Sequence, residues 1–395
     1  MTGAGLARRW VISALGIVQI FAWGSTYYLL AVLTDPILRD TGWSRTAVTG
    51  GISIGLLASG VVAMRIGRLI QTHGGRPVLA GAMVLIAAGL VLLAVAQNVV
   101  VYFLAWTVIG VGMGAGLYDA AFSTLGRLYG VDARQAIGAL TLWGGFASTI
   151  CWPISAFAVE TIGWRGTCLA YAALHLFVTL PLCLCVLPRQ TRIVPPLAAA
   201  RGPESSNPLR DPRFLLLALA GTMMSVVMAV WSVHLIAILG SQGVALATAV
   251  ALGMLIGPAQ VGARVIEMAF GGRHHPIWTM LTATVLVGLG FLGLRFQMPA
   301  SAALIAYGAG NGIWSIARGA MPLALFGAQD YPDIMGKLAT PTLLASAAAP
   351  SLGAALLSKL GGEATLTALA LAALIPVFCA LALLTLRRKE QKGVG

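Results

Sequence analysis

The sequence predicts an all-α integral membrane protein whose twelve transmembrane helices form two six-helix bundles related by internal duplication. Three observations lead to this prediction. The chain of 395 residues is 58% hydrophobic and only 9% charged, whereas a soluble domain carries about 25% charged residues. Apolar stretches of membrane-spanning length follow one another along the whole chain. Short sequence matches also recur at corresponding places in its two halves.

Twelve apolar stretches are long enough to span a membrane, because a helix crosses the hydrocarbon core with about 20 residues. Polar breaks such as Gln97-Asn98 separate them. The predicted spans are 11–33, 46–66, 78–96, 99–122, 135–158, 167–187, 214–238, 244–266, 276–294, 300–323, 338–357 and 365–386. The first run has no small-residue cleavage site, so we interpret it as a retained span and not as a signal peptide.

The basic residues predict the topology of the chain. Its net charge of +13 would suggest a nucleic-acid partner in a soluble protein. Here the basic residues gather in alternate connections, at 8–9, 65–76, 127–134, 189–213 and 387–392. This alternation is typical of a multi-pass protein with both termini in the cytoplasm. We therefore expect a bacterial inner-membrane protein that contacts the lipid bilayer and binds no nucleic acid.

One long polar segment divides the chain into halves. Residues 188–213 are rich in Pro, Arg and Ser and lack apolar periodicity, which predicts a flexible cytoplasmic linker. The predicted domains are therefore an N-terminal six-helix bundle, 1–187, and a C-terminal six-helix bundle with a short basic tail, 214–395.

Two sequence matches support an internal duplication. TYYLLAVL at 26–33 aligns with SVHLIAIL at 232–239, and THGGRP at 72–77 aligns with AFGGRH at 269–274. Both matches fall where a repeat of six spans requires them. Parallel repeats of this kind are common in secondary transporters.

The loop after the second span has a recognisable pattern, GRLIQTHGGRP at 67–77. Together with the twelve spans, the linker and the duplicated halves, it resembles the loop signature of the major facilitator superfamily. Gly67, Gly74 and Arg76 occupy signature positions, while Gln71 replaces the expected Asp. The resemblance implies a conformational role for these four residues, and Gln71 puts the charge network that usually latches this loop in doubt.

The resemblance also implies how the protein works. Members of the superfamily are two bundles that rock around a solute site near the bilayer midplane, lined by spans one, four, seven and ten. We therefore expect a small-molecule substrate, alternating access, a coupling proton and a monomer. The sequence has no ATP-binding loop and no constellation for chemistry in its spans, so we expect no enzyme, no catalytic residue, no cofactor and no metal site.

Two ionisable residues fall inside predicted spans, Asp119 in span four and Arg318 in span ten. Intramembrane charges usually face a cavity or a partner. If Gly114 corresponds to Gly310 in the duplication, the two charges lie on equivalent helices. Arg318 suits a carboxylate, which a guanidinium binds with two hydrogen bonds, and Asp119 suits a coupling proton. The alternative is a gate pair with no role in binding.

Arg264 in span eight is a third candidate. Gln260 and Arg264 lie at i, i+4, which resembles the acid and Arg of proton-coupled monocarboxylate carriers, with Gln260 in place of the acid. The match of the two loops instead places Arg264 opposite Gly67, at the cytoplasmic mouth, where Glu267 is a partner one turn away. The second interpretation is favoured, so Arg264 and Glu267 are expected to act in gating or proton coupling.

Polar and aromatic residues on spans one and ten complete the candidate site. Gln19 and Trp23 lie deep in span one, and Asn311 and Trp314 lie in span ten beside Arg318. With Arg318, these four residues are the predicted substrate-binding set.

The sequence thus favours a proton-coupled secondary transporter of a small organic anion. The alternative is an efflux transporter for a drug-like or metalloid toxicant such as arsenite, for which the five cysteines would matter. A membrane receptor that binds solute without moving it is a further, less favoured alternative.

Overall fold

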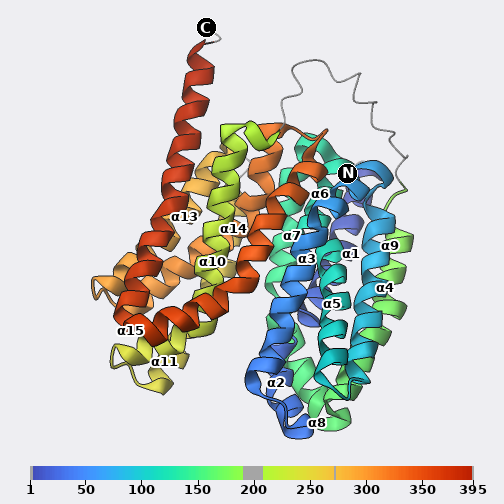
Figure 1. Ribbon diagram of the computed structural model, residues 1–395. Coiled ribbons are helices and arrows are strands. Elements are labelled where there is room, and N and C mark those ends of the chain that lie inside the picture. The colour runs from blue at the N-terminus through green and yellow to red at the C-terminus, as the bar shows by residue number, and fades with distance from the viewer. Residues whose placement is uncertain (1–2, 190–207, 271–272, 394–395) are drawn as a thin grey trace. The chain divides into compact units, whose positions relative to one another are not determined.

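The computed structural model describes residues 3–189, 208–270 and 273–393, and all regular structure in these residues is helical (Figure 1). Each of the twelve predicted spans is formed by helix there. Most of the predicted linker, 190–207, lies outside the described residues, as do Gly271 and Gly272 of the second loop match.

The chain forms two compact units. The first comprises Met1–Pro195 and Gly327–Ala347, and the second comprises Pro196–Phe326 and Ala348–Gly395. The segment Gly327–Ala347, which the sequence prediction assigns to the C-terminal bundle, thus makes its contacts with the first unit.

The first unit contains the helices of predicted spans one to six. They are α1 (Gly3–Gly24), α2 (Leu30–Thr41), α3 (Arg45–His73), α4 (Gly75–Ala94), α5 (Val99–Gly116), α6 (Tyr118–Tyr129), α7 (Ala133–Gly145), α8 (Ala147–Leu174) and α9 (Leu180–Val186). A 3₁₀ turn, Gly130–Asp132, precedes α7, and a π-helical turn, His175–Thr179, precedes α9. In Figure 1, α3, α4 and α5 run side by side, and α5 packs on both of the others.

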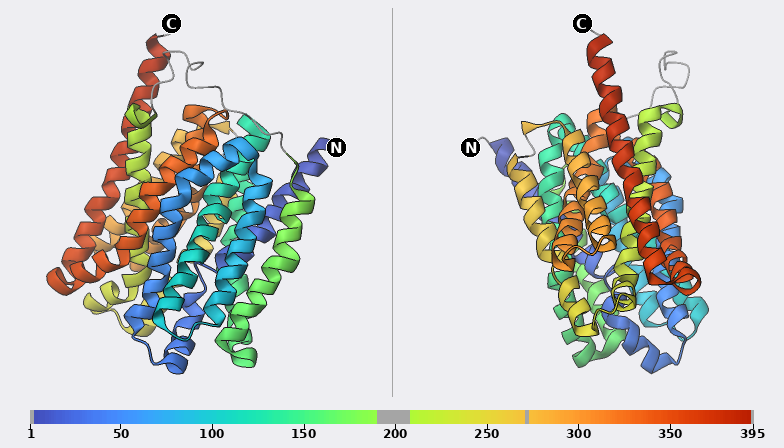
Figure 2. Two further views of the ribbon diagram at one scale, coloured as in Figure 1. Left: turned by 45° about the vertical axis from the view of Figure 1, so that its right-hand side comes forward. Right: turned by 90° about the vertical axis from the view of Figure 1, so that its left-hand side faces the viewer.

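The second unit contains the helices of predicted spans seven to ten and the second half of the last helix. They are α10 (Pro212–Ser241), α11 (Leu246–Gly253), α12 (Ile256–Phe270), α13 (Pro276–Arg295), α14 (Ala300–Phe326) and α15 (Tyr331–Gly393). A 3₁₀ turn, Pro208–Arg210, precedes α10. Gly361 interrupts α15. Figure 2 shows this helix changing direction between its orange-red part and its red part.

Seven helical stretches of the described residues are apolar and long enough to cross a membrane, judged by length and composition. Two of them, Val99–Val186 and Tyr331–Arg388, each run through more than one predicted span. Other predicted spans are built from two shorter helices, so no single helix represents them.

Four predicted spans are divided between two helices where the sequence predicts continuous ones. Span one breaks between α1 and α2, span five between α7 and α8, and span eight between α11 and α12. Span four breaks at Leu117, whose backbone is extended, with φ −83° and ψ −167°. Broken membrane helices are tolerated where side chains satisfy the freed backbone groups.

Glycines allow the same close helix crossing in both units. A methyl group on Gly110 of α5 would lie 2.2 Å from the Gly55 carbonyl oxygen of α3, and one on Gly308 of α14 would lie 2.8 Å from the Ile256 carbonyl oxygen of α12. Small residues let membrane helices approach to this distance.

The glycines one helical turn further along α5 and α14 fix the register of the duplication. A methyl group on Gly114 would contact the Ser59 carbonyl oxygen, and a methyl group on Gly312 would contact the Gln260 carbonyl oxygen. These contacts pair Gly114 with Gly312, and not with Gly310 as the sequence alignment suggests. The physical reason is that helix packing selects the glycines that face the partner helix, whichever neighbouring glycine resembles them in sequence.

The last helix pair of each half turns at a glycine of the same conformation. Gly163 has φ 70° and ψ 172°, and Gly361 has φ 78° and ψ 175°. Only glycine adopts this region without strain. In each case a threonine four residues later, Thr167 or Thr365, donates a hydrogen bond to the glycine carbonyl. The duplication is thus preserved in backbone geometry at this corner.

Polar contacts beside these corners tie the connections together. In the first unit, Arg165 and Trp164 both donate hydrogen bonds to Asp40, and the Arg165 guanidinium lies 4.2 Å from the Trp164 ring centroid. The hydrogen bond from Arg165, followed by that from Trp164, lowers the pKa of the Asp40 carboxyl below its ordinary value. In the second unit, Arg295 forms an ion pair with Glu363 at 3.5 Å.

Candidate functional site

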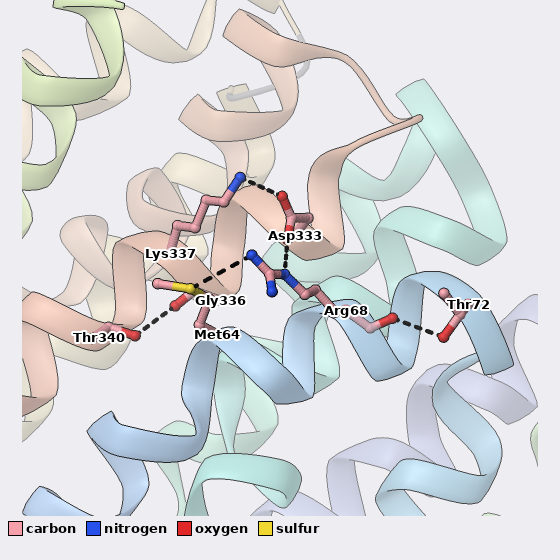
Figure 3. Close-up of polar contacts among 7 residues, drawn as sticks. All are labelled: Met64, Arg68, Thr72, Asp333, Gly336, Lys337 and Thr340. Atoms are coloured by element: carbon pink, nitrogen blue, oxygen red, sulfur yellow. Dashed lines mark hydrogen bonds and ion pairs between the residues drawn. The ribbon is translucent and has the colours of Figure 1, made fainter. Parts of the chain in front are cut away.

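The signature loop lies at the end of α3 and fastens the start of α15 within the first unit. Arg68 Nε lies 3.3 Å from Asp333 Oδ1, and Lys337 Nζ lies 2.5 Å from Asp333 Oδ2 (Figure 3). Gly67 is needed because a methyl group there would collide with the Pro332 carbonyl oxygen. The loop thus has an intact charge network, made by Arg68 with Asp333 and Lys337.

Gln71 takes part in the same contact without a charge. Its amide nitrogen donates to the carbonyl oxygen of Gln329, just before α15. A neutral hydrogen bond therefore stands where the signature has an acidic residue. Of the other predicted loop residues, Gly74 ends α3 in a glycine conformation, with φ 88°, and Arg76 lies in the first turn of α4.

Gln19 is fully buried on α1 and reaches the break in span four. Its Nε2 donates a hydrogen bond of 2.7 Å to the carbonyl oxygen of Gly116, the last residue of α5. The carbonyl groups at the end of a helix have no partner within the helix. Gln19 supplies one of these missing hydrogen bonds, so the residue and the break depend on each other.

Trp23 lies one helical turn after Gln19, against the other side of the break. Its ring centroid is 5.1 Å from that of Tyr118, the first residue of α6. Asp119 follows in the first turn of α6, where a helix N-terminus stabilises a carboxylate. The structure therefore brings Gln19, Trp23 and the start of α6 together in the first unit.

The predicted residues of span ten share one stripe of α14. Asn311, Trp314 and Arg318 follow the i, i+3, i+7 spacing that aligns side chains on a helix face. Trp314 is buried, whereas Asn311 and Arg318 are partly exposed. The stripe therefore presents an amide, an indole and a guanidinium along α14.

Arg264 is buried on α12. It is 6% exposed, and its Nε donates a hydrogen bond of 3.2 Å to the carbonyl oxygen of Gly312 on α14. Because Gln260 packs on Gly312 as Ser59 packs on Gly114, Arg264 corresponds to Ala63 and not to Gly67. The alignment of the two loops shifts the register by one turn, because α12 ends at Phe270, about one turn sooner after Gln260 than α3 ends after Ser59.

Glu267 contacts residues near the loop after α12. Its Oε1 accepts a hydrogen bond of 2.6 Å from Thr279 and lies 3.7 Å from Nε2 of His274. These contacts join the end of α12 to the start of α13. Arg264 lies one helical turn before Glu267 on α12, so its role as the partner of Glu267 stays a prediction.

The sequence analysis missed several residues of this arrangement. Tyr118 borders the break in span four, and Ser315 donates a hydrogen bond of 2.6 Å to the same Gly312 carbonyl that Arg264 contacts. Asp333 and Lys337 complete the loop contact. The sequence pattern that could have indicated the break in span four is the glycine at every second position from 110 to 116.

Within the described residues, no group of three or more His, Cys, Asp or Glu is placed to hold a metal ion. Cys151, Cys168, Cys183 and Cys379 are buried, while Cys185 is exposed. The buried thiols thus do not form a cluster that would favour a metalloid ligand.

The features described so far define a multi-span membrane protein built from two duplicated helical units, with broken spans and buried polar groups in each unit. The Major Facilitator Superfamily model matches residues 15–314, and the chain belongs to that family. It is therefore a multi-pass membrane protein of a family of secondary transporters.

Particular relatives carry the comparison further. Mouse monocarboxylate transporter 11 is 26% identical over 295 residues, which cover 72% of this chain and 57% of the mouse protein. The human organic anion transporter MFSD10 (TETRAN) has a similar structure, with a TM-score of 0.73, 17% identity and coverage of 94% of this chain and 99% of that one. For the E. coli fucose:proton symporter FucP, the TM-score is 0.72 at 14% identity, covering 94% and 98% of the two chains.

These similarities differ in what they establish. At 17% and 14% identity, the two solved structures support the fold alone. This chain spans between 35% and 57% of the length of the curated relatives that it matches. The family model and the solved structures confirm the predicted membrane fold. They do not identify the substrate.

Proposed function

We propose that the protein transports a small organic anion by alternating access, and that the second unit supplies the positive charge that binds it. The observation behind this proposal is the burial of Arg264 against α14. A guanidinium inside a membrane protein is costly to retain, so such residues usually serve substrate or ion pathways. Arg264 uses its Nε on the Gly312 carbonyl, which orients the guanidinium plane.

Arg318 is a second cation on α14. It lies on α14, the helix that Arg264 contacts, in a stripe with Asn311 and Trp314. Arginine binds carboxylates with two parallel hydrogen bonds, and an adjacent amide and indole add further donors. The names of two relatives, monocarboxylate transporter 11 and organic anion transporter MFSD10, are consistent with an anionic substrate.

We propose further that a proton gradient drives transport and that Asp119 carries the coupling proton. Its place at the start of α6, beside the break in span four, supports this role, because a break lets the local backbone move. Asp119→Asn is expected to abolish concentrative uptake while leaving exchange of anions intact. We also expect the protein in the inner membrane of a bacterium, as a monomer with both termini in the cytoplasm.

A thermal-shift screen of the purified protein tests the substrate class. Ligands that bind the folded state raise the melting temperature by mass action. Short carboxylates, amphipathic drugs and arsenite would be compared on wild type, Arg264→Ala and Arg318→Ala. A carboxylate shift that both variants lose supports the anion site, while a shift by a drug or arsenite in all three proteins favours the efflux function instead.

A further inference from the structure

Two polar atoms on α1 are buried without a hydrogen-bond partner among the described residues. They are Oε1 of Gln19 and Nε1 of Trp23. The two residues lie one helical turn apart, so their side chains are neighbours on one face of the helix. One atom is an acceptor and the other is a donor.

The orientation of the Gln19 amide follows from its contact with the broken helix. The carbonyl oxygen of Gly116 accepts a hydrogen bond, so the group that faces it at 2.7 Å must be the amide nitrogen. The amide oxygen is thereby directed away from the break. The acceptor role of Oε1 is thus fixed by chemistry.

The indole of Trp23 is held by ring contacts. Its centroid lies 5.4 Å from that of Tyr27 in an edge arrangement and 5.1 Å from that of Tyr118. These rings fix the plane of the indole and therefore the direction of its N–H. A buried donor or acceptor without a partner is unfavourable, and each exception in a native structure calls for an explanation.

Other buried groups lack this pairing. Trp231, in the second unit, also has an unpartnered Nε1, but its neighbours are the rings of Phe291 and Tyr307. Gln71 has an unpartnered Oε1 in the loop contact described above. Only Gln19 and Trp23, among the unpartnered groups of the described residues, join an acceptor and a donor one turn apart.

We propose that Gln19 and Trp23 form a substrate subsite for a neutral group that both donates and accepts a hydrogen bond, a hydroxyl or a primary amide. Gln19 Oε1 accepts from this group and Trp23 Nε1 donates to it. The inference rests on the proposed function, and it narrows the substrate to an organic anion with a second, uncharged polar group. Gln19 and Trp23 then determine specificity for that uncharged group.

Three anions of equal charge and chain length test this subsite. Butanoate, 3-hydroxybutanoate and succinamate differ in carrying no polar group, a hydroxyl or an amide. Their half-inhibitory concentrations against uptake of radiolabelled 3-hydroxybutanoate, and their own uptake rates, would be measured in proteoliposomes. Wild type is expected to prefer at least one of the polar anions over butanoate by about tenfold, because two hydrogen bonds depend on the added group.

The variants separate this subsite from folding. Trp23→Phe removes the N–H and keeps an aromatic ring, and Gln19→Leu removes the amide. Both are expected to lose the preference and still take up butanoate. Trp106→Phe, which alters another buried indole of the same unit, should keep it.

Equal uptake of the three anions by wild type, or an unchanged preference in Trp23→Phe, overturns the subsite and leaves anion transport intact. Uptake of none of the three anions overturns the proposed function, and the subsite with it.

Discussion

The two units share a scaffold and differ in polar chemistry. In both, a glycine-rich helix crosses its neighbour at backbone contact distance, at Gly110 in α5 and Gly308 in α14. In both, a side chain from another helix donates to a carbonyl of that glycine-rich helix. The donor is the neutral amide of Gln19 in the first unit and the guanidinium of Arg264 in the second.

This difference indicates how the duplication has been used. Close packing tolerates only glycine at the crossings, so the scaffold positions stay alike in both units. A side chain that reaches a backbone carbonyl needs only an N–H, which both an amide and a guanidinium provide. Gln19 lies on span one and Arg264 on span eight, so the two donors occupy different positions of the duplication, and we propose neutral recognition for Gln19 and charge recognition for Arg264.

Removing the charge of the second unit should have the largest effect. Arg264→Ala is expected to lower anion uptake by about 100-fold or more, because truncating one member of a buried charge pair costs about 2–5 kcal/mol. Gln19→Leu should lower butanoate uptake less than tenfold. Initial rates in proteoliposomes measure both.

Arg264→Lys is the matched control for charge. It keeps the cation and loses the planar fork, so uptake should lie between that of wild type and Arg264→Ala. Melting temperatures of the purified variants report whether folding is intact. Equal losses in Arg264→Ala and Gln19→Leu, with intact folding, would contradict the division of labour between the units.

The glycine crossings should respond to a single methyl group. Gly110→Ala is expected to destabilise the protein by about 1–3 kcal/mol, because the Gly55 carbonyl oxygen leaves no room for it. Gly308→Ala should cost less, since its contact is longer. Gly262→Ala on α12 has nothing within 4 Å and serves as the control. Thermal melting in detergent measures the series, and a control that falls as far as Gly110→Ala would refute the steric explanation.

The corner glycines test whether the units share backbone strain. Gly163→Ala and Gly361→Ala should each cost about 1–3 kcal/mol and should match each other, because both residues have the same conformation and open space around them. Melting temperatures of the two variants would be compared directly. A clear difference between them would show that neighbouring contacts, and not backbone conformation, set the cost.

Loss of the hydrogen bonds that Arg165 and Trp164 donate to Asp40 should have the smallest effect on stability, and this effect should depend on pH. The Arg165 hydrogen bond lowers the pKa of Asp40 below its ordinary value of 3.8. The ionised carboxylate therefore stabilises the fold above pH 3.8, and this contribution is lost as the pH falls through the lower pKa of the folded state. Asp40→Asn should therefore melt slightly below wild type at pH 7. The difference should disappear on acidification to about pH 3, and a constant difference would exclude the carboxylate as its source.

Much of the fold could be predicted because span length, basic connections and loop glycines are local patterns. The break at Leu117 and the depth of Arg264 could not. Both depend on which glycines face a neighbouring helix. Several glycines alternate along the sequence at 110–116, and their spacing does not distinguish those that contact another helix from those that do not. The pairing of Gly114 with Gly312 becomes visible only when the helices are packed.

The candidate site was predicted in part. Gln19 and Trp23 could be named from their depth in span one, but their relation to Gly116 depends on a break that no span count reveals. Asp333 was missed because it lies in a connection, where a charge is ordinary. Its role arises from tertiary contact with Arg68.

The role of Arg264 in binding the anion can be measured by uptake of radiolabelled 3-hydroxybutanoate into proteoliposomes under an inward proton gradient, with wild type and Arg264→Gln side by side. We expect saturable uptake by wild type that other carboxylates inhibit and neutral solutes do not, and loss of this uptake in a folded Arg264→Gln protein. Undiminished uptake by Arg264→Gln, or equal inhibition by neutral solutes, would contradict an anion site built on the second unit.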